Sequence, residues 1–171
     1  MGGGAVDGVT VIVDNTVLSN FASVGRLDLL AHGLGGQGVT TEAVLSEFRS
    51  GIEKGHFAQA SVDWLPVLPL TTEEETTCRV ISLRLGAGEA SCLAAAQHRG
   101  LCVATDDGDA RRYARQAGVP VSGTVGILVS LVTHRHATLG EANVLLAQMT
   151  KTGYRSPLSD LAPLLGPDCA A

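Results

Sequence analysis

The chain has 171 residues, a length typical of one domain, and its four cysteines lack the paired spacing of a zinc ribbon or a redox motif. Hydrophobic residues make up 45% of the chain and aromatic residues only 4%, which favours an α/β class with a core of Val, Leu, Ile and Ala. The formal net charge of −5 disfavours a nucleic-acid partner at first sight, and because the sequence shows neither a signal-peptide pattern nor a membrane-spanning run, we expect a cytoplasmic protein with no membrane partner.

The predicted elements of the first part of the chain alternate between strand and helix. Residues 9–13 form a β-branched run that predicts a strand buried on both faces, and Asp14 follows it directly. Residues 16–31 have apolar residues at helical spacing around one glycine, which predicts one or two short helices. A brief strand at 39–40 then leads into a helix that contains Glu47.

The rest of the chain repeats this alternation. The sequence VLPL at 67–70 predicts a strand, and a solvated, acidic helix then starts near Thr71 and continues to Leu85. Glu89 opens an alanine-rich helix that ends before Gly100. The further predicted elements are a buried strand at 101–105, a helix at 109–117, a strand at 119–121 and helices at 124–135, 140–151 and 157–165.

Strands that alternate with helices predict parallel crossovers and a sheet covered by helices on both faces. The chain shows no internal repeat and no linker long enough to divide it. We therefore predict a single domain at 9–165, preceded by a flexible N-terminus at 1–8 and followed by a C-terminal tail at 166–171.

Acidic residues follow two of the predicted strands at the point where each strand ends. Asp14 follows the first strand, and Asp106 and Asp107 follow the strand at 101–105. In an open parallel sheet, ligands bind at the carboxyl ends of the strands where the strand order reverses. Taken singly, Asp14 or Asp107 can be explained as a helix cap, and Glu89 as a first-turn acid that favours the helix dipole.

Glu47 has no such explanation, because it lies in mid-helix within an apolar arc that includes Val44 and Phe48. A buried carboxylate costs several kcal/mol unless it is paired, protonated or bound to a metal. Lys and Arg number only 12 and none lies in an apolar strand, so the acids predict a divalent cation, Mg²⁺ or Mn²⁺. Neutralising four acids would leave a net charge of −1, which no longer excludes a polyanionic partner.

Four motifs in order, VIVDNTVLSNF, VTTEAVLSEF, LGAGEASCLAAA and VATDDGDARRYA, resemble those of PIN-domain proteins, whose best-known members are the VapC-like toxin ribonucleases of toxin–antitoxin pairs. The stretch VPVSGTVGIL and the closing helices resemble a PIN subgroup other than the typical toxins. The resemblance covers about residues 9–165 and implies a three-layer α/β/α sandwich with a central parallel sheet. It also implies Mg²⁺- or Mn²⁺-dependent hydrolysis of RNA. The catalytic acids that it implies are Asp14, Glu47, Glu89 and Asp107, and the metal ligands are Asp14, Glu89 and Asp107, with Asp106 as a neighbour that can take the fourth place.

Thr16 matches the hydroxyl residue that follows the first acid of the family, and we assign it, with Arg111 and Arg112, to substrate binding; exposed arginines are also common as solubilising charges. The resemblance implies an endoribonuclease that is the toxin of a pair, with an antitoxin protein as its partner and a homodimer formed through apolar C-terminal helices. Two alternatives stay open: a non-catalytic PIN-like module that binds RNA or protein, and a structure-specific DNA nuclease.

Overall fold

A parallel sheet forms the centre of the computed structural model, which describes residues 8–58 and 60–166. The strands are β1 (Val11–Val13), β2 (Gly38–Val39), β3 (Cys102–Ala104) and β4 (Val121–Ser122). They lie in the order β2-β1-β3-β4, so the strand order reverses between β1 and β3. Residues 1–7 and 167–171, for which we predicted a flexible N-terminus and a tail, lie outside the described residues.

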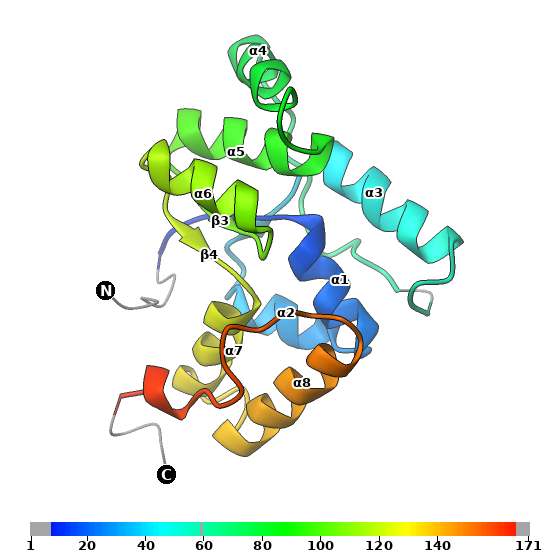
Figure 1. Ribbon diagram of the computed structural model, residues 1–171, viewed down its shortest axis with the longest axis vertical. Helices are drawn as coiled ribbons and strands as arrows, with labels where there is room; N and C mark the ends of the chain where they lie inside the picture. Colours follow the sequence, from blue (N-terminus) through cyan, green and yellow to red (C-terminus); the bar gives the residue numbers. More distant parts are fainter. Residues whose placement is uncertain (1–7, 59, 167–171) are drawn as a thin grey trace.

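Helices cover the sheet on both faces (Figure 1). One layer contains α3 (Glu42–Glu53), α4 (Thr72–Ile81), α5 (Ala87–Arg99) and α6 (Gly108–Gln116), with α4 packed on α5. The other layer contains α1 (Asn15–Ser23), α2 (Leu27–Gly33), α7 (Thr124–Thr133) and α8 (Leu139–Lys151). The predicted three-layer α/β/α sandwich is therefore confirmed. Within residues 8–58 and 60–166, no helix is long and apolar enough to cross a membrane.

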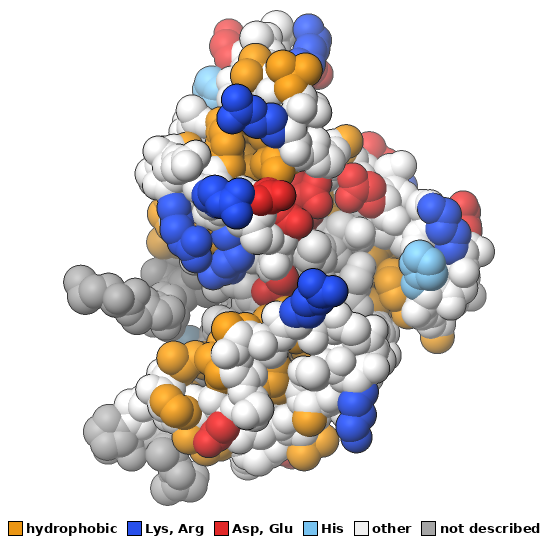
Figure 2. All heavy atoms as spheres, viewed as in Figure 1, with side chains coloured by type: hydrophobic (Ala, Val, Ile, Leu, Met, Phe, Trp, Pro, Cys, Tyr) orange, Lys and Arg blue, Asp and Glu red, His pale blue; other side chains and the backbone are white. Residues whose placement is uncertain are grey.

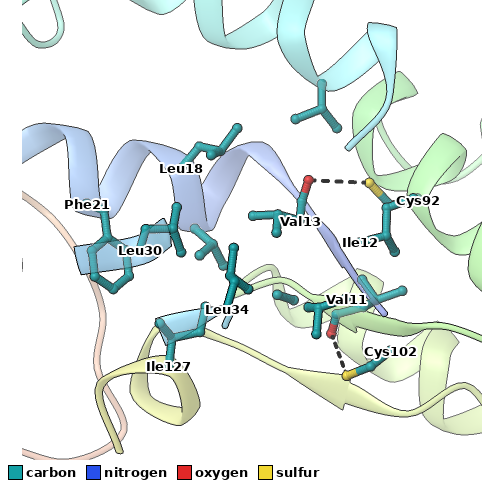
Figure 3. Packing of buried hydrophobic residues seen from close by; sticks show 14 of the residues in the cluster. Val11, Ile12, Val13, Leu18, Phe21, Leu30, Leu34, Cys92, Cys102 and Ile127 are labelled. Carbon is teal, nitrogen blue, oxygen red and sulfur yellow. Dashed lines mark hydrogen bonds between the residues drawn. The ribbon is translucent and has the colours of Figure 1, made fainter. Parts of the chain in front are cut away.

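The core lies on both sides of β1, whose three residues are all buried. Figure 3 shows Phe21 and Leu30 packed on one side of this strand, and Cys92 of α5 on the other. The small side chains of the alanine-rich α5 let this helix lie close to the sheet, so that the Cys92 thiol donates to the carbonyl oxygen of Val13 at 3.8 Å. Burial raises the pKa of this thiol well above its usual value, and Cys92 acts as a small apolar residue.

Two predicted segments are less regular than the sequence suggested, and both contain proline. In the segment 67–70, Val67 forms only an isolated bridge with Thr40, because the flanking prolines cannot donate to a strand ladder. The predicted helix at 157–165 is reduced to a single 3₁₀ turn, η1 (Ala162–Leu164), since the proline at its centre cannot continue an α-helix.

Of two further helical segments, one agrees with its prediction of one or two short helices and the other ends earlier than predicted. The residues at 16–31 form two helices, α1 and α2, and the turn between them includes Gly25 with φ of +67°. The acidic helix α4 ends at Ile81 and does not reach Leu85, because the chain turns back there to enter α5. Leu83 in this turn is 84% exposed, so no apolar burial favours a longer helix.

The acidic start of α4 is not wholly solvated as predicted, because Glu74 is only 2% exposed and forms an ion pair. The guanidinium of Arg99, in the last turn of α5, donates to both of its carboxylate oxygens, at 2.5 and 2.7 Å. Arg99 also donates to the carbonyl oxygen of Pro69 at 2.7 Å, and Glu74 accepts from the backbone N–H of Thr71. This ion pair ties α4 to α5, and Arg99 lowers the pKa of Glu74.

We predict that Arg99→Met lowers the free energy of unfolding by about 3 kcal/mol, because it leaves a buried carboxylate without its partner. The lowered pKa of Glu74 means that the pair stabilises the fold at neutral pH and that this contribution is lost as the pH falls through that pKa. Urea unfolding of the variant measures the loss. The control is Arg79→Met, which removes an ion pair with Glu75 whose side chains are 78% and 52% exposed, and which should change stability by less than about 1 kcal/mol. Equal effects of the two substitutions would contradict the assignment.

Candidate active site

Asp14 lies directly after β1 and is fully buried. Its Oδ1 accepts from the backbone N–H of Asn15 at 2.7 Å, and its Oδ2 accepts from the hydroxyls of Thr16 at 2.9 Å and Thr105 at 2.8 Å. These bonds use about three of the four lone-pair sites of a carboxylate. Burial raises the pKa of Asp14 in spite of them, and the charge of Glu47 raises it further. The acid is thus held by neutral donors and keeps its charge uncompensated.

The two threonine hydroxyls connect Asp14 to the loop after β3. The Thr16 hydroxyl accepts from the backbone N–H of Asp106 at 3.0 Å, and the Thr105 hydroxyl accepts from that of Asp107 at 3.2 Å. Each hydroxyl therefore donates to the first acid and accepts from the backbone at the second strand end. Thr16, which we assigned to substrate binding, lies inside this network, and Thr105 was not predicted at all. The only signal for Thr105 in the sequence is a hydroxyl at the end of an otherwise apolar strand.

Glu47 of α3 and Glu89 of α5 approach the same end of the sheet. Glu47 is half-buried, and its Oε1 accepts from the backbone N–H of Gly88 at 2.8 Å, in the first turn of α5 where such groups have no helical partner. Glu89 accepts no hydrogen bond from another of the described residues. Burial raises its pKa, and so do the charges of Asp14, Glu47 and Asp107, in that order. Glu89 therefore lies within electrostatic reach of the other three acids, and Asp14 within reach of Glu47.

The carboxylates of Asp106 and Asp107 differ in the number of hydrogen bonds that they accept from the protein. Asp107 caps α6 by accepting from the backbone N–H of Ala110 at 2.8 Å, and its Oδ2 accepts from none of the described residues. Asp106 has four donors: the N–H and hydroxyl of Thr124 at 3.0 and 2.5 Å, the Asn20 amide at 3.0 Å and the Tyr154 hydroxyl at 3.3 Å. Asp107 thus has an oxygen to offer a ligand, whereas Asp106 joins β3 to α1, α7 and the segment after α8.

The arginines that we assigned to substrate binding have other contacts. One Nη of Arg111 donates to the carbonyl oxygens of Thr105 and Ser122, each at 2.8 Å, and so joins the ends of β3 and β4. Arg112 is exposed and pairs with Asp109 at 2.8 Å. Among the residues that the structure describes, no Lys or Arg forms an ion pair with Asp14, Glu47, Glu89 or Asp107.

The family model described as DUF3368, PIN domain, matches residues 10–165 of the chain. The chain belongs to the PIN-domain family. PIN domains are generally nucleases and typically use divalent metals. No curated protein and no solved structure matches the chain. The match confirms the resemblance read from the order of the four acidic motifs.

The acids of this PIN domain fit a hard cation by their chemistry, since they offer carboxylate oxygens and an excess of negative charge. They are not arranged as a closed ligand sphere: in the described part of the chain, no three His, Cys, Asp or Glu side chains are grouped closely enough to hold one ion. Figure 2 shows acidic side chains near the centre of one face, with Lys and Arg side chains on either side of them. A divalent cation would supply the missing counter-charge.

The raised pKa of Asp14 predicts how its removal affects the stability of the metal-free PIN domain. The folded state holds the Asp14 proton more tightly than the unfolded chain, so the ionised carboxylate costs stability as the pH rises through the raised pKa. Asp14→Asn keeps the acceptor for Asn15, and its amide can donate to the two threonine hydroxyls. In EDTA, we expect this variant to gain in Tm relative to the wild type between about pH 4 and pH 8.

Thermal unfolding over this pH range checks the prediction, with Asp63→Asn as the control because Asp63 is exposed. If the difference in Tm between the wild type and Asp14→Asn stays constant with pH, burial of the ionised Asp14 carboxylate does not destabilise the fold.

Proposed function

We propose that this PIN domain is a divalent-metal-dependent endoribonuclease that hydrolyses the phosphodiester bonds of RNA. The observation that carries the proposal is the group formed by Asp14, Glu47, Glu89 and Asp107 where the strand order reverses. Burial and the charges of neighbouring acids raise the pKa of Asp14 and of Glu89, and no Lys or Arg in the described part of the chain pairs with any of the four acids. Mg²⁺ or Mn²⁺ is the counter-ion that such oxygen ligands prefer.

Each acid has a role that follows from its surroundings. Asp14, Glu89 and Asp107 would hold the metal, for which the Glu89 and Asp107 side chains would have to move closer to Asp14, and the threonine hydroxyls fix the Asp14 carboxylate in place. A divalent cation bound there supplies a Lewis acid for the phosphate and a source of hydroxide at neutral pH. Glu47 keeps one oxygen free of protein donors, and we assign to it the orientation of the attacking water and the acceptance of its proton. Asp106 does not contact the metal in this assignment; its bonds to Asn20, Thr124 and Tyr154 hold the loop that contains Asp107 in place.

Two clefts border the acids and support cleavage within a strand. One of about 460 Å³ is lined by Asn15, Glu47 and Lys54, and the other, of about 640 Å³, by residues that include Asp106 and Arg111. Glu47 lines the first cleft, and Asp106, next to Asp107, lines the second, so we assign the two clefts to the RNA on either side of an internal phosphodiester.

The finer assignment is the toxin of a toxin–antitoxin pair, which the resemblance to toxin ribonucleases supports. In this assignment the protein acts in the cytoplasm, an antitoxin protein blocks the acids, and two copies form a homodimer. Val144 of α8 is 56% exposed, and this apolar side chain offers a surface that a second copy would cover.

The proposal predicts that the purified protein cuts RNA with Mn²⁺ and stops when EDTA is added. Matched RNA and DNA oligonucleotides of one sequence are incubated with the wild type and with Asp14→Asn. We expect cleavage of RNA only, reduced more than about 100-fold by the substitution, because the loss of a metal ligand exceeds that of an outer partner. If the DNA oligonucleotide is cut as fast as the RNA, the proposed RNA specificity is wrong and the protein is a DNA nuclease. If EDTA-sensitive cleavage of either strand is absent, the protein is a binding module.

Gly88→Ala provides a second test, since it displaces Glu47 without changing any charge. A Cβ at Gly88 would lie 2.5 Å from Oε2 of Glu47, so this flexible side chain must move away and lose its bond to the Gly88 N–H. The fold should persist, because alanine favours a helix by about 1 kcal/mol over glycine. We expect a loss of roughly tenfold or more in the cleavage rate with little change in Tm.

The matched control is Gly108→Ala in the first turn of α6. A Cβ there meets no atom within 4 Å, although Gly108 is next to Asp107. An equal effect of both alanines on the cleavage rate would exclude Glu47 from the reaction.

A further inference from the structure

The cleft of about 640 Å³ beside Asp106 has two walls from distant parts of the chain. Arg111 and Arg115 of α6 line one wall, and the segment after α8 lines the other with Tyr154 and Arg155. We call it the arginine cleft. Its volume lies in the range of sites that take small ligands. Asp106 lines this cleft, and its backbone N–H donates to the Thr16 hydroxyl that binds Asp14, so the cleft lies next to the candidate active site.

The arginine cleft is cationic in a chain whose net charge is −5. Arg111 and Arg115 are four residues apart and therefore lie on one face of α6. Neither Arg115 nor Arg155 forms an ion pair or a side-chain hydrogen bond within residues 8–58 and 60–166. Asp106 is the one acid among the lining residues described, and four protein donors already occupy it. The guanidinium groups of Arg115 and Arg155 are thus available to bind an anion, whereas that of Arg111 already donates to two backbone carbonyl oxygens.

The same cleft has an apolar surface. Val125 and Val129 of α7 line it, together with Leu158 and Leu164 from the segment after α8. A free phosphate would use the arginines alone and leave the exposed parts of Val125, Leu158 and Leu164 in water. A nucleotide carries both a phosphate, which guanidinium groups bind in bidentate fashion, and a base, which packs on apolar or aromatic side chains.

We propose that the arginine cleft is a nucleotide subsite that holds one unpaired residue of a single-stranded RNA beside the bond to be cut. Arg115 and Arg155 contact its phosphates, and Leu158 contacts its base. This inference rests on the proposed function for the choice of RNA. A duplex does not fit, since its bases are paired and turned away from the protein surface.

Binding of a labelled single-stranded RNA, measured by fluorescence anisotropy in EDTA at several KCl concentrations, tests the subsite without any cleavage. Arg115→Gln and Arg155→Gln are each expected to weaken binding roughly tenfold and to reduce the slope of log Kd against log salt by about 0.7. The control is Arg135→Gln, because Arg135 is exposed and lies beyond the other end of α7. It should leave both quantities unchanged.

An oligonucleotide with abasic sites distinguishes the contribution of the base to binding from that of the phosphate. Leu158→Ala should weaken binding of the normal RNA and leave that of the abasic strand unchanged, with the Tm of each variant measured to confirm folding. The subsite is overturned if the wild type does not bind the RNA, if the Arg115, Arg155 and Arg135 variants lose affinity equally, or if a duplex binds more tightly than the single strand. Binding that depends on Arg115 and Arg155 in a protein without cleavage activity would overturn the proposed function and leave the subsite in place.

Discussion

The buried carboxylate of Asp14 is the interaction on which the arrangement of the site depends. It receives the hydroxyls of Thr16 and Thr105, and these hydroxyls in turn accept the backbone N–H groups after β3. One carboxylate thereby fixes the ends of both central strands at the reversal of strand order. The donors are neutral, so the network positions the acid without cancelling its charge. A site that must attract a cation needs both properties, and a lysine in place of either hydroxyl would supply only the first.

The neighbouring acids Asp106 and Asp107 show how packing separates the roles of similar residues. Asp106 is bound by donors from Asn20, Thr124 and Tyr154, which lie in three different segments of the second helical layer. Gly123 permits this approach, because a Cβ there would lie 2.5 Å from Oδ1 of Asp106. Asp107 binds only the backbone N–H of Ala110 through its Oδ1, as the N-cap of α6, and its Oδ2 accepts from none of the described residues. The first acid anchors the loop, and the second is left for chemistry.

The sequence predicted the parallel sheet well, because buried strands leave a local pattern in the chain. The apolar runs before Asp14 and Asp106 indicate buried strands, and the apolar arc around Glu47 correctly indicates an acid that needs a partner. The partner itself, the N–H of Gly88, lies 41 residues away, and no local pattern encodes that contact. The same holds for the Glu74 pair with Arg99, 25 residues apart, and for the bond between Asp106 and Thr124. Proline explains the segments where apolar spacing alone predicted too much regular structure.

Several arginines of the chain pair with acids that lie away from the candidate site. Five arginines pair with acids outside the candidate site, which leaves the four central carboxylates without a protein cation in the described residues. Asp107 caps α6, and Arg111 follows it by one turn, but the Arg111 guanidinium donates to the carbonyl oxygens of Thr105 and Ser122 and forms no ion pair with Asp107. Arg112, one position further round the helix, pairs with Asp109 and is excluded from the arginine cleft. The arginines near the site therefore do not neutralise the acids in the described residues, and a ligand that contacts both groups under the proposed function carries one phosphate for the metal and a further anionic group for Arg115.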